Sequence, residues 1–259
     1  MLITLTTDFG TGDHFVGVMK GVILDIAPRA RIVDITHEIE PYDVNQAAFV
    51  IAQAWRYFPK KTVHVIVIDP GVGSARRPIL AQAGGQFFIA PDNGVLSMIY
   101  DSGPHTVRTI SNPKLMSKMI SRTFHGRDVF APAAAHLASG VAPAKFGKRI
   151  DDYVRSSTLK PRRAADGAIA GTVLKVDRFG NLITNLHIDD FPGVRTRPME
   201  LRIGGERIHR LALTFAEAAI GELFVIVGSS GYLEIAANQA SAAKLLGCGA
   251  GVPVELRIS

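Results

Sequence analysis

Two short segments combine titratable side chains with the glycine and proline residues that make tight loops. Asp69-Pro70-Gly71-Val72-Gly73-Ser74-Ala75-Arg76 follows the apolar run 63–68, which is short enough for a buried strand. Phe124-His125-Gly126-Arg127-Asp128 precedes a helix-like run. Open α/β sheets usually place their chemistry at the carboxyl ends of buried strands. Asp69, Arg76 and His125 are therefore candidates for an acid, a cation and a base sharing one site, although each alone is more simply a loop residue.

A third candidate is Asp8, a carboxylate at the end of the first expected strand. Asp8-Phe9-Gly10 matches the metal-binding triplet of protein kinases, but no upstream lysine strand or glycine loop accompanies it. Gly10-Thr11-Gly12 lacks the third glycine of a dinucleotide fingerprint. Asp8 is predicted either to accept bonds from both hydroxyls of a ribose or to cap the following helix.

Two segments in the second half of the chain carry further polar groups. In Asp177-Arg178-Phe179-Gly180-Asn181, the polar residues fit turn chemistry. They also fit a site in which Asp177 takes an ammonium, Phe179 stacks on a ring and Asn181 contacts a base edge. Gly228-Ser229-Ser230-Gly231 offers hydroxyls and backbone N–H groups suited to a carboxylate. Both interpretations stay open for each segment.

Several other kinds of site are not supported by the residue spacing. The eight histidines and the single cysteine, Cys248, show neither His-x-x-x-His nor Cys-x-x-Cys spacing, so no metal site is expected. No Gly-x-Ser-x-Gly segment is present to supply an esterase-type nucleophile. The net charge of +6 and the pI near 9.6 are typical of proteins that bind nucleic acid. However, the basic residues are scattered, with one cluster at Lys160-Pro161-Arg162-Arg163 and no interleaved aromatic stripe, which argues against that class.

The order of expected elements divides the chain into two parts. Strand-like segments 2–6, 31–35, 63–68, 86–89 and 106–110 alternate with helix-like segments 13–26, 44–57, 94–100 and 129–138. This alternation predicts an α/β domain over residues 1–155 with a mostly parallel central sheet. Residues 156–167 are polar and basic and predict a linker. Residues 168–259 predict a smaller all-β domain, barrel-like or a compact sandwich, with strands near 169–176, 182–186, 199–203, 208–213, 223–227, 233–236 and 254–258. Short helices are possible at 217–220 and 240–246.

Composition fits an ordinary globular protein of 259 residues, with 47% hydrophobic and 20% charged residues. No apolar run approaches the length of a membrane span, and the amino-terminal segment lacks the basic region of a secretory signal. A single cysteine cannot form an internal disulfide and fits a reducing compartment. We therefore expect a cytoplasmic protein with no membrane partner.

Taken together, these segments resemble the S-adenosylmethionine hydroxide adenosyltransferases, a family related to the fluorinase and chlorinase enzymes. The resemblance covers nearly the whole chain, and its specificity lies in the joint order of many short motifs. The matching segments are Thr7-Asp8-Phe9-Gly10, Gly17-Val18-Met19-Lys20-Gly21, Asp34-Ile35-Thr36-His37, Asp69-Pro70-Gly71-Val72-Gly73, Ala90-Pro91-Asp92-Asn93-Gly94, Phe124-His125-Gly126-Arg127-Asp128, Asp177-x-Phe179-Gly180-Asn181 and Ser229-Ser230-Gly231-Tyr232-Leu233-Glu234-Ile235.

The resemblance implies a homotrimer whose sites lie between the first domain of one subunit and the second domain of its neighbour. It implies hydrolysis of S-adenosyl-L-methionine to adenosine and L-methionine without a cofactor, and it points to the (R)-sulfonium epimer as the substrate. It assigns Asp69, Arg76 and His125 to catalysis. The substrate-binding residues that it implies are Asp8, Tyr42, Phe124, Asp177, Phe179, Asn181, Ser229, Ser230, Tyr232, Glu234 and Asn238.

Two positions depart from the halogenating relatives. Ser230 stands where those enzymes resemble one another in having arginine, which puts binding of the methionine carboxylate there in doubt. Tyr42 stands where they have tryptophan and keeps an aromatic wall. The halogenases lack the Asp–Arg–His set, so its presence here favours water over halide as the nucleophile.

The expected chemistry is displacement at the ribose C5′ carbon. The leaving group is a neutral thioether and needs no acid, so the difficulty lies in activating water, whose pKa is about 15.7. Arg76 would hold a developing hydroxide while Asp69 and His125 orient it and take its proton. The alternatives are a 5′-halogenase and a sensor that binds adenosine or S-adenosylmethionine without turnover.

Overall fold

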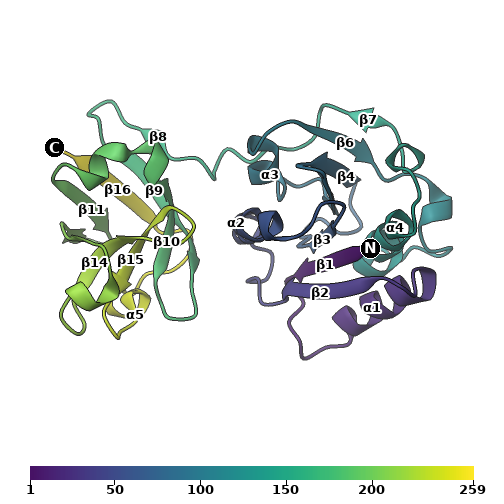
Figure 1. Cartoon of the computed structure of the whole chain (residues 1–259), viewed down its shortest axis with the longest axis horizontal. Coiled ribbons are helices and arrows are strands. Elements are labelled where there is room, and N and C mark those ends of the chain that lie inside the picture. Colours follow the sequence, from purple (N-terminus) through teal and green to yellow (C-terminus); the bar gives the residue numbers. More distant parts are fainter. The chain divides into compact units, whose positions relative to one another are not determined.

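The computed structural model describes residues 1–259 and divides into two compact units, Met1–Ser156 and Ser157–Ser259 (Figure 1). Each unit is built around its own β-sheet, so the expected organisation in two sheet-containing parts is confirmed. Residues 162–163 of the expected linker form a short strand, β8 (Arg162–Arg163), which pairs with β9 of the second unit. No helix in the structure is long and apolar enough to cross a membrane.

The first unit contains a seven-stranded mixed sheet in the order β2-β1-β3-β5-β4-β6-β7. The strands are β1 (Leu2–Thr7), β2 (Arg31–Thr36), β3 (Val63–Val67), β4 (Pro78–Ala83), β5 (Gln86–Pro91), β6 (His105–Thr109) and β7 (Arg149–Ile150). Strands β2, β1, β3 and β5 pair in parallel, whereas β4 pairs antiparallel with β5 and β6, and β6 with β7.

The prediction of a mostly parallel sheet was therefore only partly correct. Strand β4 is absent from the sequence prediction, and a two-residue Gly84-Gly85 turn folds it back onto β5. Such a short connection can join only antiparallel strands, because a parallel pairing needs a crossover of a dozen or more residues. The antiparallel half of the sheet begins at this hairpin.

Helices cover both faces of the first sheet. One face packs against α1 (Phe15–Ile26) and α4 (Ala131–Ala138), and the other packs against α2 (Val44–Ala54) and α3 (Ser97–Asp101). The alternation along β3 explains this division, because Val63, Val65 and Val67 belong to the first core and Ile66 to the second. Short helical turns lie at Trp55–Tyr57, Pro113–Leu115 and Pro143–Lys145, and a π-helical turn at Gly126–Phe130 leads directly into α4.

The second unit is a nine-stranded sheet in the order β12-β11-β16-β9-β10-β15-β14-β13, with β8 paired to β9. The remaining strands are β9 (Ile169–Val176), β10 (Leu182–His187), β11 (Met199–Ile203), β12 (Glu206–Ile208), β13 (Leu211–Ala212), β14 (Leu223–Val227), β15 (Tyr232–Ala237) and β16 (Pro253–Ile258). Its pairings are antiparallel except that of β13 with β14. One helix, α5 (Ala242–Leu246), and short turns at Ile188–Asp190, Pro192–Arg195 and Phe215–Glu217 accompany the sheet.

Candidate functional site

Asp69 and Arg76 lie at the two ends of the loop that leaves the carboxyl end of β3. Arg76 Nε donates to Asp69 Oδ1 at 2.9 Å, and Arg76 Nη2 donates to Asp69 Oδ2, so the contact is bidentate. Both side chains are buried, with 9% of Arg76 and 5% of Asp69 exposed. Inside the loop, Ser74 Oγ donates to the carbonyl of Gly71 at 2.6 Å. The loop therefore closes on itself and holds a buried carboxylate against a buried guanidinium.

His125 completes this cluster although it is distant in sequence. Arg76 Nη2 donates to His125 Nδ1 at 2.6 Å. Because a guanidinium can only donate, Nδ1 must be the acceptor, and the neutral imidazole then carries its proton on Nε2. Burial lowers the pKa of His125, and the positive charge of Arg76 lowers it further, while Asp69 and Asp128 act in the opposite direction. A hydrogen bond to the backbone of Ser121 also acts to raise this pKa, but burial and Arg76 outweigh it, so His125 is neutral at pH 7.

The Arg76 guanidinium is not saturated by these contacts. Nη1 is buried and has no hydrogen-bond partner. The guanidinium carbon lies 5.3 Å from the centre of the Phe130 ring, which supports the cation from the other side. One nitrogen of a buried cation, with its two N–H groups, is thus left without a partner among the protein's own groups.

The backbone around His125 is fixed by Asp128 and by the loop of the Asp69–Arg76 pair. Asp128 accepts the backbone N–H of Ser121 at 2.8 Å and Arg127 Nε at 2.7 Å. Burial acts to raise the pKa of Asp128, but these hydrogen bonds outweigh it and hold the pKa below its usual value. Gly73 has φ of +77°, and a Cβ there would lie 2.3 Å from the carbonyl oxygen of Arg122. Only glycine allows the two loops to approach this closely.

Asp69 and His125 face a hollow of about 330 Å³ in the first unit. Three of the residues implied to bind substrate line it as well, namely Asp8, Tyr42 and Phe124. The structure thus brings all the first-unit candidates together, with Arg76 behind Asp69 and His125. The rest of the wall consists of Phe9, Phe15, Pro41, Val67, Val72, Thr123 and Gly126.

Asp8 is held at the edge of this hollow by two segments. Its Oδ2 accepts the backbone N–H of Tyr42 at 2.9 Å. Burial raises the pKa of Asp8, and the Tyr42 hydrogen bond opposes that effect. His37, from the Asp34-Ile35-Thr36-His37 segment, contacts Thr7 Oγ1 through Nδ1 at 2.8 Å, and its carbonyl accepts the N–H of Gly10 at 2.8 Å. The backbone is therefore fixed on both sides of Asp8.

Sequence reasoning missed the aromatic side of the hollow. The ring of Phe15 lies 5.6 Å from that of Phe9 and 5.2 Å from that of Phe124, and the ring of Phe9 lies 5.9 Å from that of Phe124. Phe9 and Phe15 flank the glycine-rich segment after β1. Because both lie close in sequence to the candidate ligand Asp8, the sequence could have indicated an aromatic wall here. Together the three rings form an apolar wall next to Asp8 and His125.

In the second unit, the 177–181 segment forms a tight turn between β9 and β10. Asp177 Oδ1 accepts the backbone N–H groups of Phe179 and Asn181, each at 2.9 Å, and Oδ2 accepts Asn181 Nδ2 at 3.0 Å. Asp177 thus performs the turn chemistry that the sequence allowed, with both oxygens engaged. Asn181 is buried, whereas Phe179 projects with 79% of its surface exposed.

The remaining second-unit candidates are distributed along β15. Ser229 and Ser230 lie in the turn before it, Tyr232 and Glu234 on it and Asn238 directly after it. The pairing of Leu182 with Ile235 places the Asn238 end of β15 beside the 177–181 turn, and His187 pairs with Tyr232 at the other end. Burial raises the pKa of Glu234, and the nearby Asp177 charge adds to this effect. The structure therefore places the two serines and Asn238 at opposite ends of one strand.

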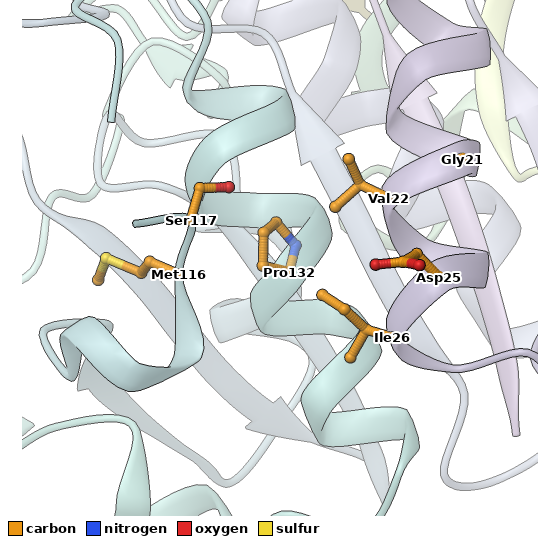
Figure 2. Close-up of a pocket in the computed structure, with 7 residues that line it drawn as sticks. All are labelled: Gly21, Val22, Asp25, Ile26, Met116, Ser117 and Pro132. Carbon is orange, nitrogen blue, oxygen red and sulfur yellow. The ribbon is translucent and has the colours of Figure 1, made fainter. Parts of the chain in front are cut away.

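A second hollow in the first unit holds none of the candidate residues. It measures about 380 Å³ and lies between α1 and α4, where Val22 and Ile26 face Pro132 and Asp25 supplies the one carboxylate (Figure 2). Size alone therefore does not identify the site, because the smaller hollow is the one lined by Asp8, Asp69 and His125. No group of three or more His, Cys, Asp or Glu side chains is arranged to hold a metal ion.

Comparison with known proteins places these features in a family. The model of the SAM hydroxide adenosyltransferase N-terminal domain matches residues 3–147, and that of the corresponding C-terminal domain matches residues 171–255. The chain therefore has the domain composition of an adenosyltransferase, with one N-terminal and one C-terminal domain of this type. The chain belongs to the SAM hydroxide adenosyltransferase family.

Individual relatives agree with this assignment over nearly the whole chain. A Salinispora arenicola protein named (R)-S-adenosyl-L-methionine hydrolase is 40% identical, with 94% of this chain and 93% of the relative covered. A fluorinase from an Actinoplanes species is 33% identical, with 98% and 97% covered. The crystal structure of an uncharacterized conserved protein from Thermotoga maritima matches with a TM-score of 0.90 at 39% identity, covering 99% of each chain.

Proposed function

We propose that this protein hydrolyses (R)-S-adenosyl-L-methionine to adenosine and L-methionine. Relatives named for this reaction are 36–40% identical over nearly their full length, and relatives named fluorinase are more distant. The observation that carries the proposal is the contact of Arg76 with both Asp69 and His125 beside the hollow that Asp8 lines. That arrangement suits activation of water next to a nucleoside.

The reaction balances without a cofactor. Water attacks the C5′ carbon of the ribose, the C5′–S bond breaks with its electron pair going to sulfur, and one proton is released. Methionine leaves as a neutral thioether, so the protein needs no acid on that side. Catalysis then consists of orienting water in line with the C5′–S bond and removing its proton during attack.

The tautomer of His125 divides the roles within the cluster. Its Nδ1 stays on Arg76, and the imidazole, which lines the hollow, orients the attacking water. Asp69 is the group with acceptor capacity, so it takes the water's proton. Arg76 holds Asp69 and His125 in place, and its positive charge stabilises the developing hydroxide.

The other candidate residues serve binding. Asp8 accepts the ribose hydroxyls, and Tyr42 and Phe124 form aromatic walls. Of the second-unit residues, Asn181 and Asn238 contact the adenine, Phe179 packs on the substrate, and Asp177, Ser229, Ser230, Tyr232 and Glu234 surround the methionine part. A substrate with a base at one end and an amino acid at the other needs contacts at separate places, in keeping with the spread of these residues along β15.

We extend the proposal to the domains and the assembly. Residues 1–155 supply catalysis, 156–167 connect, and 168–259 form a barrel-like substrate-binding domain. The chain acts as a homotrimer in which the first domain of one subunit and the second domain of its neighbour share each substrate. Proximity of β12 and β14, which are far apart in the strand order, supports curling of the second sheet toward a barrel.

One incubation separates this function from its competitors. Purified protein is given each sulfonium epimer in turn, with and without chloride or fluoride, and products are identified by mass spectrometry. Adenosine and methionine formed faster from the (R) epimer, with one ¹⁸O from labelled water in adenosine, support the hydrolase. Halide-dependent 5′-halo-5′-deoxyadenosine would identify a halogenase instead. Binding without turnover would identify a sensor.

A further inference from the structure

The Ala90-Pro91-Asp92-Asn93-Gly94 segment, to which no role has yet been given, lies at the base of the 69–76 loop. Asn93 Nδ2 donates to the carbonyl of Ile68 at 2.9 Å, and Ile68 directly precedes Asp69. Asn93 Oδ1 accepts the backbone N–H of Val95 at 3.2 Å, which sets the orientation of the amide. The first stem of the loop is therefore attached to Asn93.

The neighbouring residue holds the other stem. Asp92 Oδ2 accepts Arg77 Nε at 3.0 Å and Arg77 Nη2 at 2.7 Å, and the backbone N–H of Asp92 donates to the Arg77 carbonyl at 2.8 Å. Arg77 directly follows Arg76. Asp92 Oδ1 accepts the N–H of Val154 at 2.8 Å, so both of its oxygens are occupied. Only 3% of this carboxylate is exposed, which makes the contact a buried and fully satisfied one.

Two adjacent residues thus fix both ends of one loop. The loop is bracketed by Ile68 and Arg77, and the Asp69–Arg76 contact closes it from within. If either stem moved, Asp69 and Arg76 would move relative to His125, whose segment meets the loop at Arg76 Nη2 and at Gly73. Displacement of about 1 Å in reacting groups costs rates on the order of 100-fold.

We propose that Asp92 and Asn93 are positioning residues that set the geometry of Asp69 and Arg76 by clamping the two stems of the 69–76 loop. The proposal rests on the proposed function for its rate effects, but the clamp itself is a property of the loop. Neither residue lines the hollow that faces Asp69 and His125. Their effect therefore falls on turnover and not on binding of the nucleoside.

The chain offers a matched control for Asn93. Asn112 has the same local chemistry but makes no hydrogen bond with the 69–76 loop: its Oδ1 accepts the N–H two residues on, at Lys114, and its Nδ2 donates to the carbonyl of Lys145 at 2.8 Å. Asn93→Asp and Asn112→Asp each keep the acceptor and replace the donor by an oxygen that repels the carbonyl. We expect Asn93→Asp to lower kcat by about 10- to 100-fold, and Asn112→Asp to leave it within about twofold.

Asp92 has a control in the second partner of Arg77. Asp152 accepts Arg77 Nη1 at 2.9 Å but is 78% exposed. Asp92→Asn should lower kcat by about 10-fold or more, whereas Asp152→Asn should leave it nearly unchanged. In both position-92 and position-93 variants, calorimetry should show adenosine affinity within about threefold of wild type. Thermal unfolding establishes that each protein is folded at the assay temperature.

A second measurement does not depend on turnover. The pKa of His125 is obtained by NMR titration in each variant, because the charges that face this imidazole are those of Arg76, Asp69 and Asp128. The pKa should rise toward its ordinary value in Asn93→Asp and Asp92→Asn and stay unchanged in the two controls. If folded Asn93→Asp and Asp92→Asn proteins keep the wild-type kcat and the wild-type His125 pKa, the clamp is disproved. If wild-type protein lacks hydrolase activity, the proposed function fails and the titration still decides the clamp.

Discussion

Asp8 Oδ2 accepts the backbone N–H of Tyr42 at 2.9 Å, and Tyr42 has φ of +69°, in the left-handed region that a bulky residue rarely adopts. The aromatic side chain of Tyr42 is 71% exposed, so burial of its ring does not explain this conformation. Strained backbone of this kind is kept where the surrounding structure fixes it and often marks a ligand site. The proposed role of Asp8 toward the ribose must therefore be separated from its contact with the Tyr42 segment.

Replacement of Asp8 should weaken adenosine binding. Asp8→Ala removes a charged acceptor, and we expect a loss of about 1.5–3 kcal/mol in binding free energy by calorimetry. Asp8→Asn keeps an oxygen for the Tyr42 N–H. If the carboxylate itself binds the ribose, the adenosine affinity of this variant should still be lower than that of wild type. Wild-type affinity in Asp8→Asn would assign the carboxylate to holding Tyr42 alone, and wild-type affinity in Asp8→Ala would remove it from the site.

Replacement of the catalytic candidates should lower turnover while leaving adenosine bound. Asp69→Asn and His125→Ala should each lower kcat by about two to four orders of magnitude, the range for positioned acid–base groups. Asn is the better probe at position 69, because Ala would leave the buried Arg76 cation without its partner. Arg76→Lys should also have a low kcat, since an ammonium cannot reproduce the bidentate contact with Asp69. The exposed His209 serves as control, and His209→Ala should have wild-type kcat.

His64 should make the stability of the first unit depend on pH. Its Nδ1 contacts Thr4 Oγ1 at 2.7 Å and its Nε2 contacts Gln86 Oε1, and burial lowers its pKa to about 4. The unfolded chain, with a pKa near 6.5, binds more protons between pH 6.5 and 4, so folding stability falls as pH falls through that window. The full effect is on the order of 3 kcal/mol. Denaturant unfolding at pH 7 and pH 5 should show a smaller decrease for His64→Gln than for wild type; equal decreases would contradict the assignment.

Gly180 should be intolerant of a side chain, because it lies in the turn that carries Asn181. It has φ of +89°, and a Cβ would lie 2.1 Å from Ser241 Oγ. Gly180→Ala should lower the free energy of unfolding by about 2–5 kcal/mol, the sum of backbone strain and overpacking. Gly205, with φ of +92° and no atom within 4 Å of the added Cβ, is the control, and Gly205→Ala should cost only about 1–2 kcal/mol. Equal losses would show that the approach of Ser241 is irrelevant.

Local patterns could predict part of this site, and tertiary contacts decide the rest. Asp69 follows a run too apolar to be exposed, and Arg76 lies in the same loop, so their encounter was predictable from chain order. His125 lies 49 residues beyond Arg76 and reaches it only through the packing of two loops. Strand β4 was missed because Pro-Ile-Leu-Ala-Gln-Ala has little β-branched character, and that omission hid the antiparallel half of the sheet. In the sequence, Asp177 fitted both a turn and a ligand contact, and only the fold shows that both of its oxygens are used by its own turn.

A subunit-mixing experiment tests whether each site is shared between two chains. Under the proposed function, His125→Ala should disable the first-domain half of a site, and Asn181→Ala should disable the second-domain half. If each site combines the first domain of one subunit with the second domain of its neighbour, mixed trimers contain some sites in which both halves are intact. Each half is intact with a probability of about one half, so about one boundary in four is wild type.

The two inactive proteins are mixed, dissociated and re-annealed, and subunit exchange is measured with two affinity tags. Activity near a quarter of that of wild type treated in the same way supports the shared site. Re-annealed samples of each variant alone should stay inactive, which controls for reactivation by the procedure itself. If exchange is complete and no activity returns, each site lies within one chain, because no subunit in the mixture carries both intact residues.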